Sequence, residues 1–321
     1  MQAQLLIGAG AGVVSAALFT SAAASASLAG FLLYLCPLPL CLAGLGWGRR
    51  SVALAGVAAT IVMLVTLGPV AALGYALVVA IPIAVLVHLI LQSRPAGQPD
   101  GDGKAAIEWY PAGRLVAAAA LIAGTLAGLM LLALGPDATS YQAIIDEMVP
   151  RIQKALDPDD TVFTPDMVEK LRAILPRALP FAFAIVWLCI ALFNLWLAGT
   201  IAKVSGQTLR PWPDLHGLEI PGAMVAVFAG ALIASFVPGM IGFIASGFAS
   251  AMLLAYVLQG LAVIHVYSLG MKFRPLLLLG IYLGILFLGW LAVLVAILGL
   301  GEPMFGLRAR KNAAGGRKDN D

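Results

Sequence analysis

Acidic residues are missing from every long apolar stretch of this 321-residue chain, and charged residues make up only 11% of it. A membrane protein that moves protons or cations through side-chain carboxylates keeps at least one carboxylate at membrane depth. The sequence therefore disfavours a proton pump, a carboxylate-based antiporter and an intramembrane metalloprotease. Cysteine is also scarce: Cys36, Cys41 and Cys189 form no disulfide or metal-binding pattern, so we expect them to pack as small apolar side chains.

Catalytic and nucleotide-binding motifs are lacking as well. The chain has no Gly-x-Ser-x-Gly elbow and no His-Glu-x-x-His zinc motif, and its glycine-rich start at residues 8–12 matches neither the Walker nor the dinucleotide pattern. We therefore expect no enzyme activity, no cofactor and no metal site. The net charge of only +3 does not suggest a nucleic-acid partner.

What the chain does contain is apolar sequence, with 61% hydrophobic residues and a mean hydropathy of +0.99. Runs long enough to cross a bilayer predict an all-α, polytopic transmembrane bundle with about eight, or else nine, spans. Gly68-Pro69 and Pro238-Gly239 are expected to reverse the chain between neighbouring spans. The nine candidate runs are 4–22, 28–47, 51–68, 71–92, 114–135, 179–202, 221–237, 240–268 and 275–299.

Basic residues predict the orientation of these spans. Four loops that contain Lys or Arg agree with one alternating topology, in which the N-terminus is cytoplasmic and residues 136–178 lie outside. The basic tail, residues 301–321, should also be cytoplasmic, although nine crossings would place it outside. We therefore favour eight crossings, with the short run 221–237 re-entrant or a neighbouring pair miscounted.

The only long polar segment, 136–178, holds eight acidic and five basic residues. Apolar residues at helical spacing predict two amphipathic helices, the second starting after Thr164 with Pro165 as its first residue. These helices form either a packing cap on the bundle or a lid over an outward-facing pocket. The acidic turn between them, residues 157–160, lacks the glycine and closing glutamate of a calcium loop.

Few polar side chains remain within the spans. Asn194 and Gln259 are either interhelical hydrogen-bonding residues or part of a solute pocket, together with His265. Pro37 and Pro39 interrupt the second span and should free backbone carbonyls, as the broken helices of transporters do; a simple kink is the alternative. His88 and His265 could together ligate a b-type haem, but their positions near the span ends explain them without one.

Small residues recur every fourth position in four spans, which predicts close helix crossings. They can mediate packing within the chain or contact with a partner. The stripes are Gly8, Gly12 and Ala16; Gly124 and Gly128; Gly242, Ser246 and Ser250; and Gly280 and Gly284.

The proline break in the second span, the stretch 259–264 and the Phe-x-x-Arg ending at Phe305–Arg308 resemble those of the YybS-like family of uncharacterised bacterial membrane proteins. That family is similar to the substrate-binding components of energy-coupling-factor transporters. The resemblance implies a helical bundle that binds a small solute and docks on a separate coupling subunit. It also implies docking through Gly8, Gly12 and Ala16 on the first helix.

These observations predict a small-solute binding or transport component without its own ATPase, located in the bacterial inner membrane. Its predicted solute site comprises Pro37, Pro39, Asn194, Gln259 and His265. The alternative is an envelope structural or assembly factor that acts through helix contacts. The predicted partners are the lipid bilayer, an unknown small solute and a coupling subunit or another membrane protein. The predicted domains are the bundle 1–135, the outer segment 136–178, the bundle 179–300 and the tail 301–321.

Overall fold

The computed structural model describes residues 2–21, 26–96, 106–157, 163–308 and 310–311, and these are almost entirely helical. The all-α class expected from the sequence is therefore confirmed. The chain divides into two compact units: unit 1 comprises residues 1–119 and 189–215, and unit 2 comprises residues 120–188 and 216–321. The domain boundaries drawn from the sequence stay a prediction.

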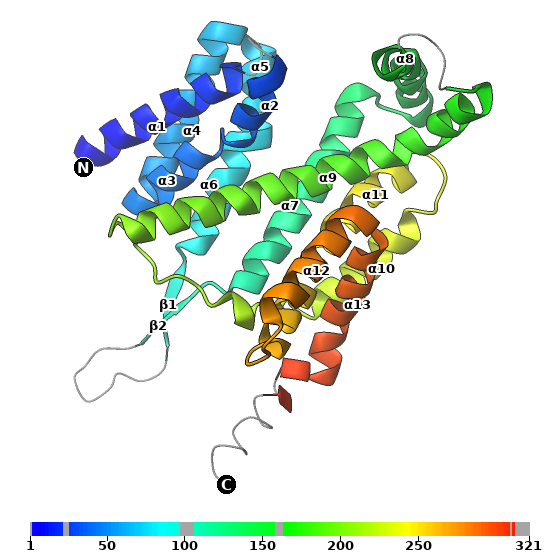
Figure 1. Ribbon diagram of the computed structural model, residues 1–321. Coiled ribbons are helices and arrows are strands. Elements are labelled where there is room, and N and C mark those ends of the chain that lie inside the picture. Colours follow the sequence, from blue (N-terminus) through cyan, green and yellow to red (C-terminus); the bar gives the residue numbers. More distant parts are fainter. Residues whose placement is uncertain (1, 22–25, 97–105, 158–162, 309, 312–321) are drawn as a thin grey trace. The chain divides into compact units, whose positions relative to one another are not determined.

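Unit 1 begins with a run of apolar helices, coloured blue to cyan in Figure 1. The reversal predicted at Gly68-Pro69 is confirmed, because Gly68 has φ 87° and Pro69 is the first residue of a helix. A π-helical turn, Ala76–Ala80, joins α5 to α6 without ending the span. The helices are α1 (Gln2–Ser21), α2 (Ala26–Tyr34), α3 (Leu38–Trp47), α4 (Arg49–Leu67), α5 (Pro69–Tyr75) and α6 (Ile81–Ile90).

A short antiparallel hairpin follows α6, with β1 (Ser93–Ala96) paired to β2 (Ala106–Trp109). Arg94 Nε lies 2.7 Å from Glu108 Oε2 across the hairpin. This hydrogen bond lowers the pKa of the Glu108 carboxyl and raises the pKa of the Arg94 guanidinium. Both groups are exposed, so the pair contributes little to stability.

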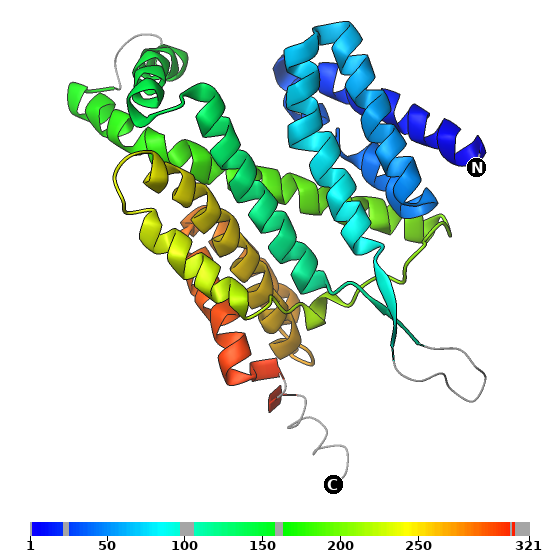
Figure 2. The ribbon, with the colours of Figure 1, turned by 180° about the vertical axis from the view of Figure 1, so that it is seen from behind.

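Unit 2 is built around α11 (Met240–Tyr267), which packs against α10 (Ala223–Ala234) and α13 (Trp290–Phe305). The reversal predicted at Pro238-Gly239 is confirmed, since Gly239 has φ 78° and immediately precedes α11. A 3₁₀ turn, Leu215–Gly217, precedes α10, and α12 (Arg274–Leu288) precedes α13. Figure 2 shows these helices from behind.

The outer amphipathic helix α8 (Ala138–Leu156) packs on the ends of other helices of unit 2. Its residues Tyr141, Ile145 and Val149 are buried and form one cluster with Leu131 and Phe243. Leu131 belongs to α7 (Ala112–Leu134), and Phe243 lies in the first turn of α11. Asp137 caps α8 by accepting hydrogen bonds from the backbone N–H groups of residues 139 and 140.

The second outer helix differs from the expectation of a separate element. It starts at Pro165, where Thr164 Oγ1 accepts from the N–H of Met167 at 3.3 Å, as predicted. However, it continues through Pro176 and Pro180 to Val204, so the outer helix and the sixth span form a single helix, α9 (Pro165–Val204). Forty residues correspond to roughly 60 Å, about twice the hydrocarbon thickness. We therefore expect its first half to project outside the bilayer.

The last candidate span, 275–299, is corrected by the structure. Gly289, with φ 50°, divides it into α12 and α13, and neither helix reaches the length of a full span. Arg274 Nε donates to Ser268 Oγ at 3.4 Å, and Tyr267 Oη donates to Leu307 O at 2.8 Å. The α12–α13 hairpin thus begins and ends beside the C-terminus of α11, which agrees with a tail on the same side as Arg274.

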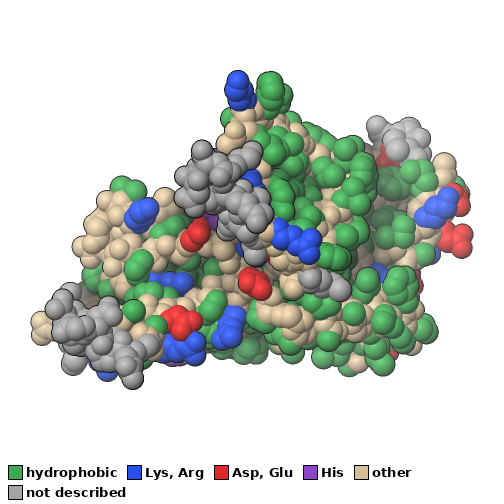
Figure 3. Space-filling view, turned by 90° about the horizontal axis from the view of Figure 1, so that it is seen from below, with side chains coloured by type: hydrophobic (Ala, Val, Ile, Leu, Met, Phe, Trp, Pro, Cys, Tyr) green, Lys and Arg blue, Asp and Glu red, His purple; other side chains and the backbone are tan. Residues whose placement is uncertain are grey.

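Seven helical segments within the described residues are long and apolar enough to cross a membrane. Many of their large apolar side chains are exposed, including Val65 at 80% and Val70 at 84%. Apolar side chains also cover much of the face seen in Figure 3, where Lys and Arg side chains gather in separate patches. The segments are Gln4–Ser21, Gly30–Trp47, Arg49–Leu67, Pro69–Ile90, Ala112–Leu134, Pro165–Val204 and Met240–Tyr267.

Candidate functional site

The predicted break in the second span lies in unit 1, where buried polar side chains surround it. The helix is interrupted at residues 35–37, and α3 starts at Leu38. The freed Tyr34 carbonyl accepts a hydrogen bond from Asn194 Nδ2 at 2.8 Å. The Cys36 carbonyl accepts from Ser15 Oγ, which also contacts Tyr75 Oη. Side chains of α1 and α9 therefore satisfy carbonyls of the interrupted turn, and Tyr75 of α5 holds the Ser15 hydroxyl.

Asn194 has one hydrogen-bonding group to spare. It is 0% exposed, and its Nδ2 also donates to Ile190 O at 2.8 Å, whereas its Oδ1 has no partner within the described structure. One water or one donor group of a ligand would satisfy this oxygen. The structure thus places Pro37, Pro39 and Asn194 in one unit, and only Asn194 retains hydrogen-bonding capacity for a solute.

Gln259, by contrast, is fully used within unit 2. Its Oε1 accepts from the N–H of Ile220 at 2.6 Å, and its Nε2 donates to Gly299 O at 2.8 Å. Pro303 lies four residues after Gly299 and has no N–H, so the Gly299 carbonyl lacks its usual helical donor. The amide supplies that donor. Gln259 therefore connects α11, α13 and the segment before α10.

His265 lies near the end of α11 rather than in a pocket with Gln259. Its Nε2 is 2.9 Å from Tyr282 Oη, and its ring centroid is 6.3 Å from that of His216. His88 belongs to unit 1 and is exposed. The structure therefore places His265 beside Tyr282 and His216, neighbours that the sequence spacing did not suggest.

The predicted docking stripe on α1 lies against α4. A Cβ atom added to Gly12 would collide with Ala55 O, and one added to Gly8 would approach Ser51 O to 2.8 Å. Ala16 is 0% exposed. The close helix crossing that these residues predict is thus made within unit 1. Docking of a partner through the same stripe stays a prediction, and it would require α4 to move aside.

An open groove of about 450 Å³ lies at the end of unit 2 where α8 packs. Helices α8 and α9 form its walls, and the turn before α11 closes one end. Its volume is within the range of small-molecule sites, roughly 300–1,000 Å³. Its lining residues are Gln142, Asp146, Glu169, Arg172, Ala173, Pro176, Arg177, Pro238, Gly239 and Phe243.

Charged groups of both signs face this groove. Arg172 Nε lies 3.9 Å from Asp146 Oδ1, with both side chains about half exposed. The Arg177 guanidinium carbon lies 5.7 Å from the centre of the Phe243 ring, and its Nε donates to Ser235 O at 3.3 Å. Phe243 is itself part of the buried cluster with Tyr141, so the floor of the groove is held by packing. Hydropathy alone could not identify this site, because its residues come from three segments far apart in the sequence.

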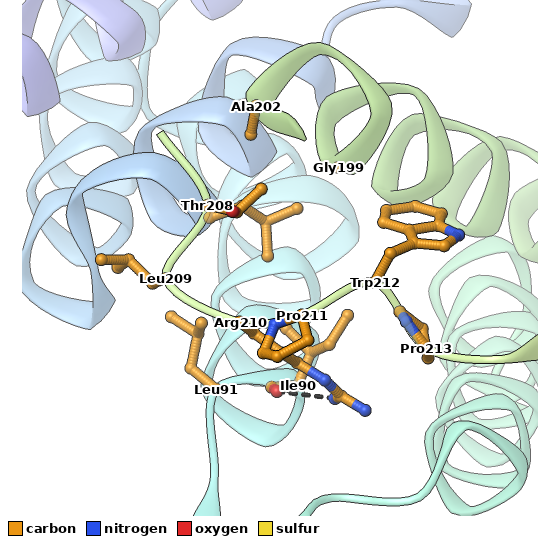
Figure 4. Close-up of a pocket in the computed structure, with 11 residues that line it drawn as sticks. Ile90, Leu91, Gly199, Ala202, Thr208, Leu209, Arg210, Pro211, Trp212 and Pro213 are labelled. Carbon is orange, nitrogen blue, oxygen red and sulfur yellow. Dashed lines mark hydrogen bonds between the residues drawn. The ribbon is translucent and has the colours of Figure 1, made fainter. Parts of the chain in front are cut away.

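A second, narrower cavity of about 30 Å³ lies in unit 1, where the segment 208–213 packs against the ends of α3 and α6 (Figure 4). Arg210 Nη1 donates to Ile90 O at 2.8 Å, and its guanidinium lies 5.7 Å from the Trp109 ring centre. Burial lowers the pKa of Arg210 from its ordinary value. This cavity has room for about one water molecule and not for a solute.

One buried carboxylate lies just beyond the last predicted run. Glu302 is 6% exposed, in the last turn of α13, and its Oε1 accepts from Arg308 Nε at 2.7 Å. Arg308 also donates to the carbonyls of His216 and Leu218. This pair fixes the start of the tail to the segment before α10. Because it lies at the end of α13 with a paired cation, it does not place an acid at mid-span.

Comparison with known proteins gives one match. The DUF2232 family, described as a predicted membrane protein, matches residues 13–301. No curated protein and no solved structure matches the chain.

Proposed function

This chain belongs to the DUF2232 family of predicted membrane proteins, and we propose that it binds a small polar solute in the outer groove of unit 2. The groove is the observation on which this proposal rests. It combines a ligand-sized volume with charged side chains, and its floor is held rigid by the buried cluster around Tyr141 and Phe243. Binding sites of this kind need preformed walls and a few polar groups that orient the ligand.

The mechanism that follows is recognition without catalysis. Gln259, His265 and the proline break hold the helices of each unit in place, and the groove side chains contact the solute. Asn194 Oδ1, the unpaired amide oxygen of the break, takes no part in the groove and accepts from a bound water. No cofactor takes part in this proposal.

Transport by this protein would require a separate source of energy, because the chain has no nucleotide-binding motif. The YybS-like resemblance and the similarity of that family to energy-coupling-factor components support a separate coupling subunit. Basic loops and apolar helices support a place in the bacterial inner membrane with the groove facing outward. The alternative role of an envelope assembly factor needs free small-residue stripes. Gly12, Gly124 and Gly284 approach other helices of their own unit, and Gly280 is the stripe glycine with open space around it.

The proposal is tested by thermal stability of the purified full chain against a library of polar metabolites. A ligand at one hundred times its dissociation constant stabilises the folded state by about 2.7 kcal/mol, which is measurable as a raised melting temperature. Ala173→Trp fills the groove without changing its charge and should abolish the shift. Ala155→Trp, an exposed residue on α8 outside the groove, should leave it intact. A library without any stabilising compound, or a shift that survives in Ala173→Trp, would show that the groove binds no solute.

A further inference from the structure

We infer that the groove recognises a dipolar solute, one that carries both an ammonium group and a carboxylate. This inference rests on the proposed solute-binding function and specifies the chemistry of the ligand. The groove presents two arginines, Arg172 and Arg177, and two carboxylates, Asp146 and Glu169. A solute with a single charge would leave two like charges of the protein facing it, whereas a dipolar solute can pair with both kinds.

The arginines provide the site for the carboxylate of the solute. The ion pair between Arg172 and Asp146 is long, at 3.9 Å, and half exposed, so it contributes little and can be exchanged for a ligand. Arg177 is oriented by the Phe243 ring and by Ser235 O, which accepts from its Nε. Within the described residues, its terminal nitrogens make no hydrogen bond. Planar guanidinium groups bind carboxylates with two parallel hydrogen bonds.

The carboxylates provide the site for the ammonium group. Within the part of the chain that the structure describes, Glu169 makes no ion pair and no hydrogen bond, although it lines the groove one turn before Arg172. When a solute carboxylate takes Arg172, Asp146 loses its weak partner and becomes available too. The Gln142 amide can donate or accept at the same wall.

The spacing of these groups along α9 limits the size of the solute. Glu169 and Arg172 are three residues apart, about 4.5 Å along the helix axis, and Glu169 and Arg177 are eight apart, about 12 Å. Solutes from the size of an amino acid to that of a short peptide therefore span the two kinds of charge. A volume of about 450 Å³ accommodates this range.

The test uses three dipolar probes of increasing length, β-alanine, alanyl-alanine and trialanine, and measures their affinity for the purified full chain by calorimetry. Each probe is compared with its N-acetylated form, which lacks the ammonium, and its C-amidated form, which lacks the carboxylate. At least one free probe should bind, and blocking either end should weaken it at least tenfold. This comparison needs no variant and is independent of any folding defect.

Two charge variants assign the ends of the solute. Arg172→Gln should weaken binding of the free probe at least tenfold but change binding of the C-amidated form, which is already weak, only little. Glu169→Gln should likewise weaken binding of the free probe at least tenfold but change binding of the N-acetylated form only little. Glu147→Gln and Arg151→Gln, both exposed on α8 and outside the groove, are the matched controls.

Two outcomes would overturn the inference. The first is that the blocked probes bind as tightly as the free ones. The second is that no dipolar probe binds, while a library compound binds to the wild-type protein and not to Ala173→Trp. In both cases solute binding by the groove stands, and only its dipolar selectivity is rejected.

Discussion

The bridge made by Gln259 gives a prediction whose size can be derived from the structure. Gln259→Met keeps the volume of the side chain but removes the amide. The N–H of Ile220 and the carbonyl of Gly299 then both lose their partner. Gln259 and Ile220 are 0% and 1% exposed, so water cannot readily replace the amide.

Two limits bound the cost of this substitution. A buried backbone group without a partner costs about 1–3 kcal/mol in water-soluble proteins. Interhelical hydrogen bonds in membranes contribute only about 0.6 kcal/mol on average, because the unfolded chain in the bilayer also finds partners. For two groups these values give about 1–6 kcal/mol. We expect a loss of about 2 kcal/mol, because one of the two groups, the Ile220 N–H, lies in a connecting segment.

The assay is unfolding of the purified protein in mixed micelles titrated with a denaturing detergent. Pro303→Ala supplies residue 303 with an N–H that can donate to Gly299 O in the ordinary helical pattern. Gln259→Met should therefore cost about 1 kcal/mol less in the Pro303→Ala background. Pro275→Ala is the matched control, because Pro275 lies in the first turn of α12, where its N–H would have no helical acceptor. An equal cost of Gln259→Met in all three backgrounds would refute the argument.

Three further substitutions test other parts of the structure. Gly12→Leu should destabilise unit 1 by about 1–3 kcal/mol, because its side chain would collide with α4. Gly10→Leu should be neutral, because a Cβ atom added there has nothing within 4 Å. Equal thermal stability of the two variants would contradict the α1–α4 packing. Glu302→Gln should leave Arg308 without its counter-charge, at a cost of up to about 3 kcal/mol, and should speed tryptic cleavage after Arg308. Arg310→Gln, at an exposed position, should not speed this cleavage. Unchanged cleavage in Glu302→Gln would exclude a fixed tail. Burial raises the pKa of Tyr141 to about 12, above an unfolded value of about 10. Its contribution to stability should therefore be complete below about pH 10 and lost as the pH rises to about 12. Tyr141→Phe should flatten this part of the pH–stability curve, and an identical curve would show that Tyr141 is not buried.

Hydropathy and proline placement were enough to predict much of the fold. Seven of the nine apolar runs are long apolar helical segments, and the reversals at Gly68-Pro69 and Pro238-Gly239 were predicted because proline cannot continue a preceding helix. The division of 275–299 was not predictable in this way. Unlike Gly68 and Gly239, Gly289 has no neighbouring proline that would mark its positive φ in the sequence.

Of the candidate sites too, only a part could be predicted from the sequence. The cluster around Pro37 could be located from the sequence, because a proline within a span must free carbonyls that some side chain then satisfies. The groove could not, since its charges lie on α8 and α9 and its remaining wall is the turn at Pro238, and only tertiary packing joins these segments. The continuity of α9 also escaped prediction, because Pro176 and Pro180 mark a boundary in the sequence but are accommodated within the helix. The calcium-like turn at residues 157–160 and the end of the basic tail lie mostly outside the described residues.

Three proline sites in this chain share one physical solution. Tyr34 O near Pro37 accepts from Asn194, and Gly299 O before Pro303 accepts from Gln259. The third carbonyl, Pro176 O, lacks a donor because of Pro180 and accepts from Tyr141 at 3.4 Å. In each case a polar side chain from another helix satisfies a backbone carbonyl left free near a proline, and so fixes one helix against another at a chosen position. The buried amides of the spans are thereby largely committed to backbone carbonyls, and ionised side chains with spare hydrogen-bonding capacity remain at the helix ends. For this reason solute recognition is expected at the outer groove rather than in the middle of the bundle.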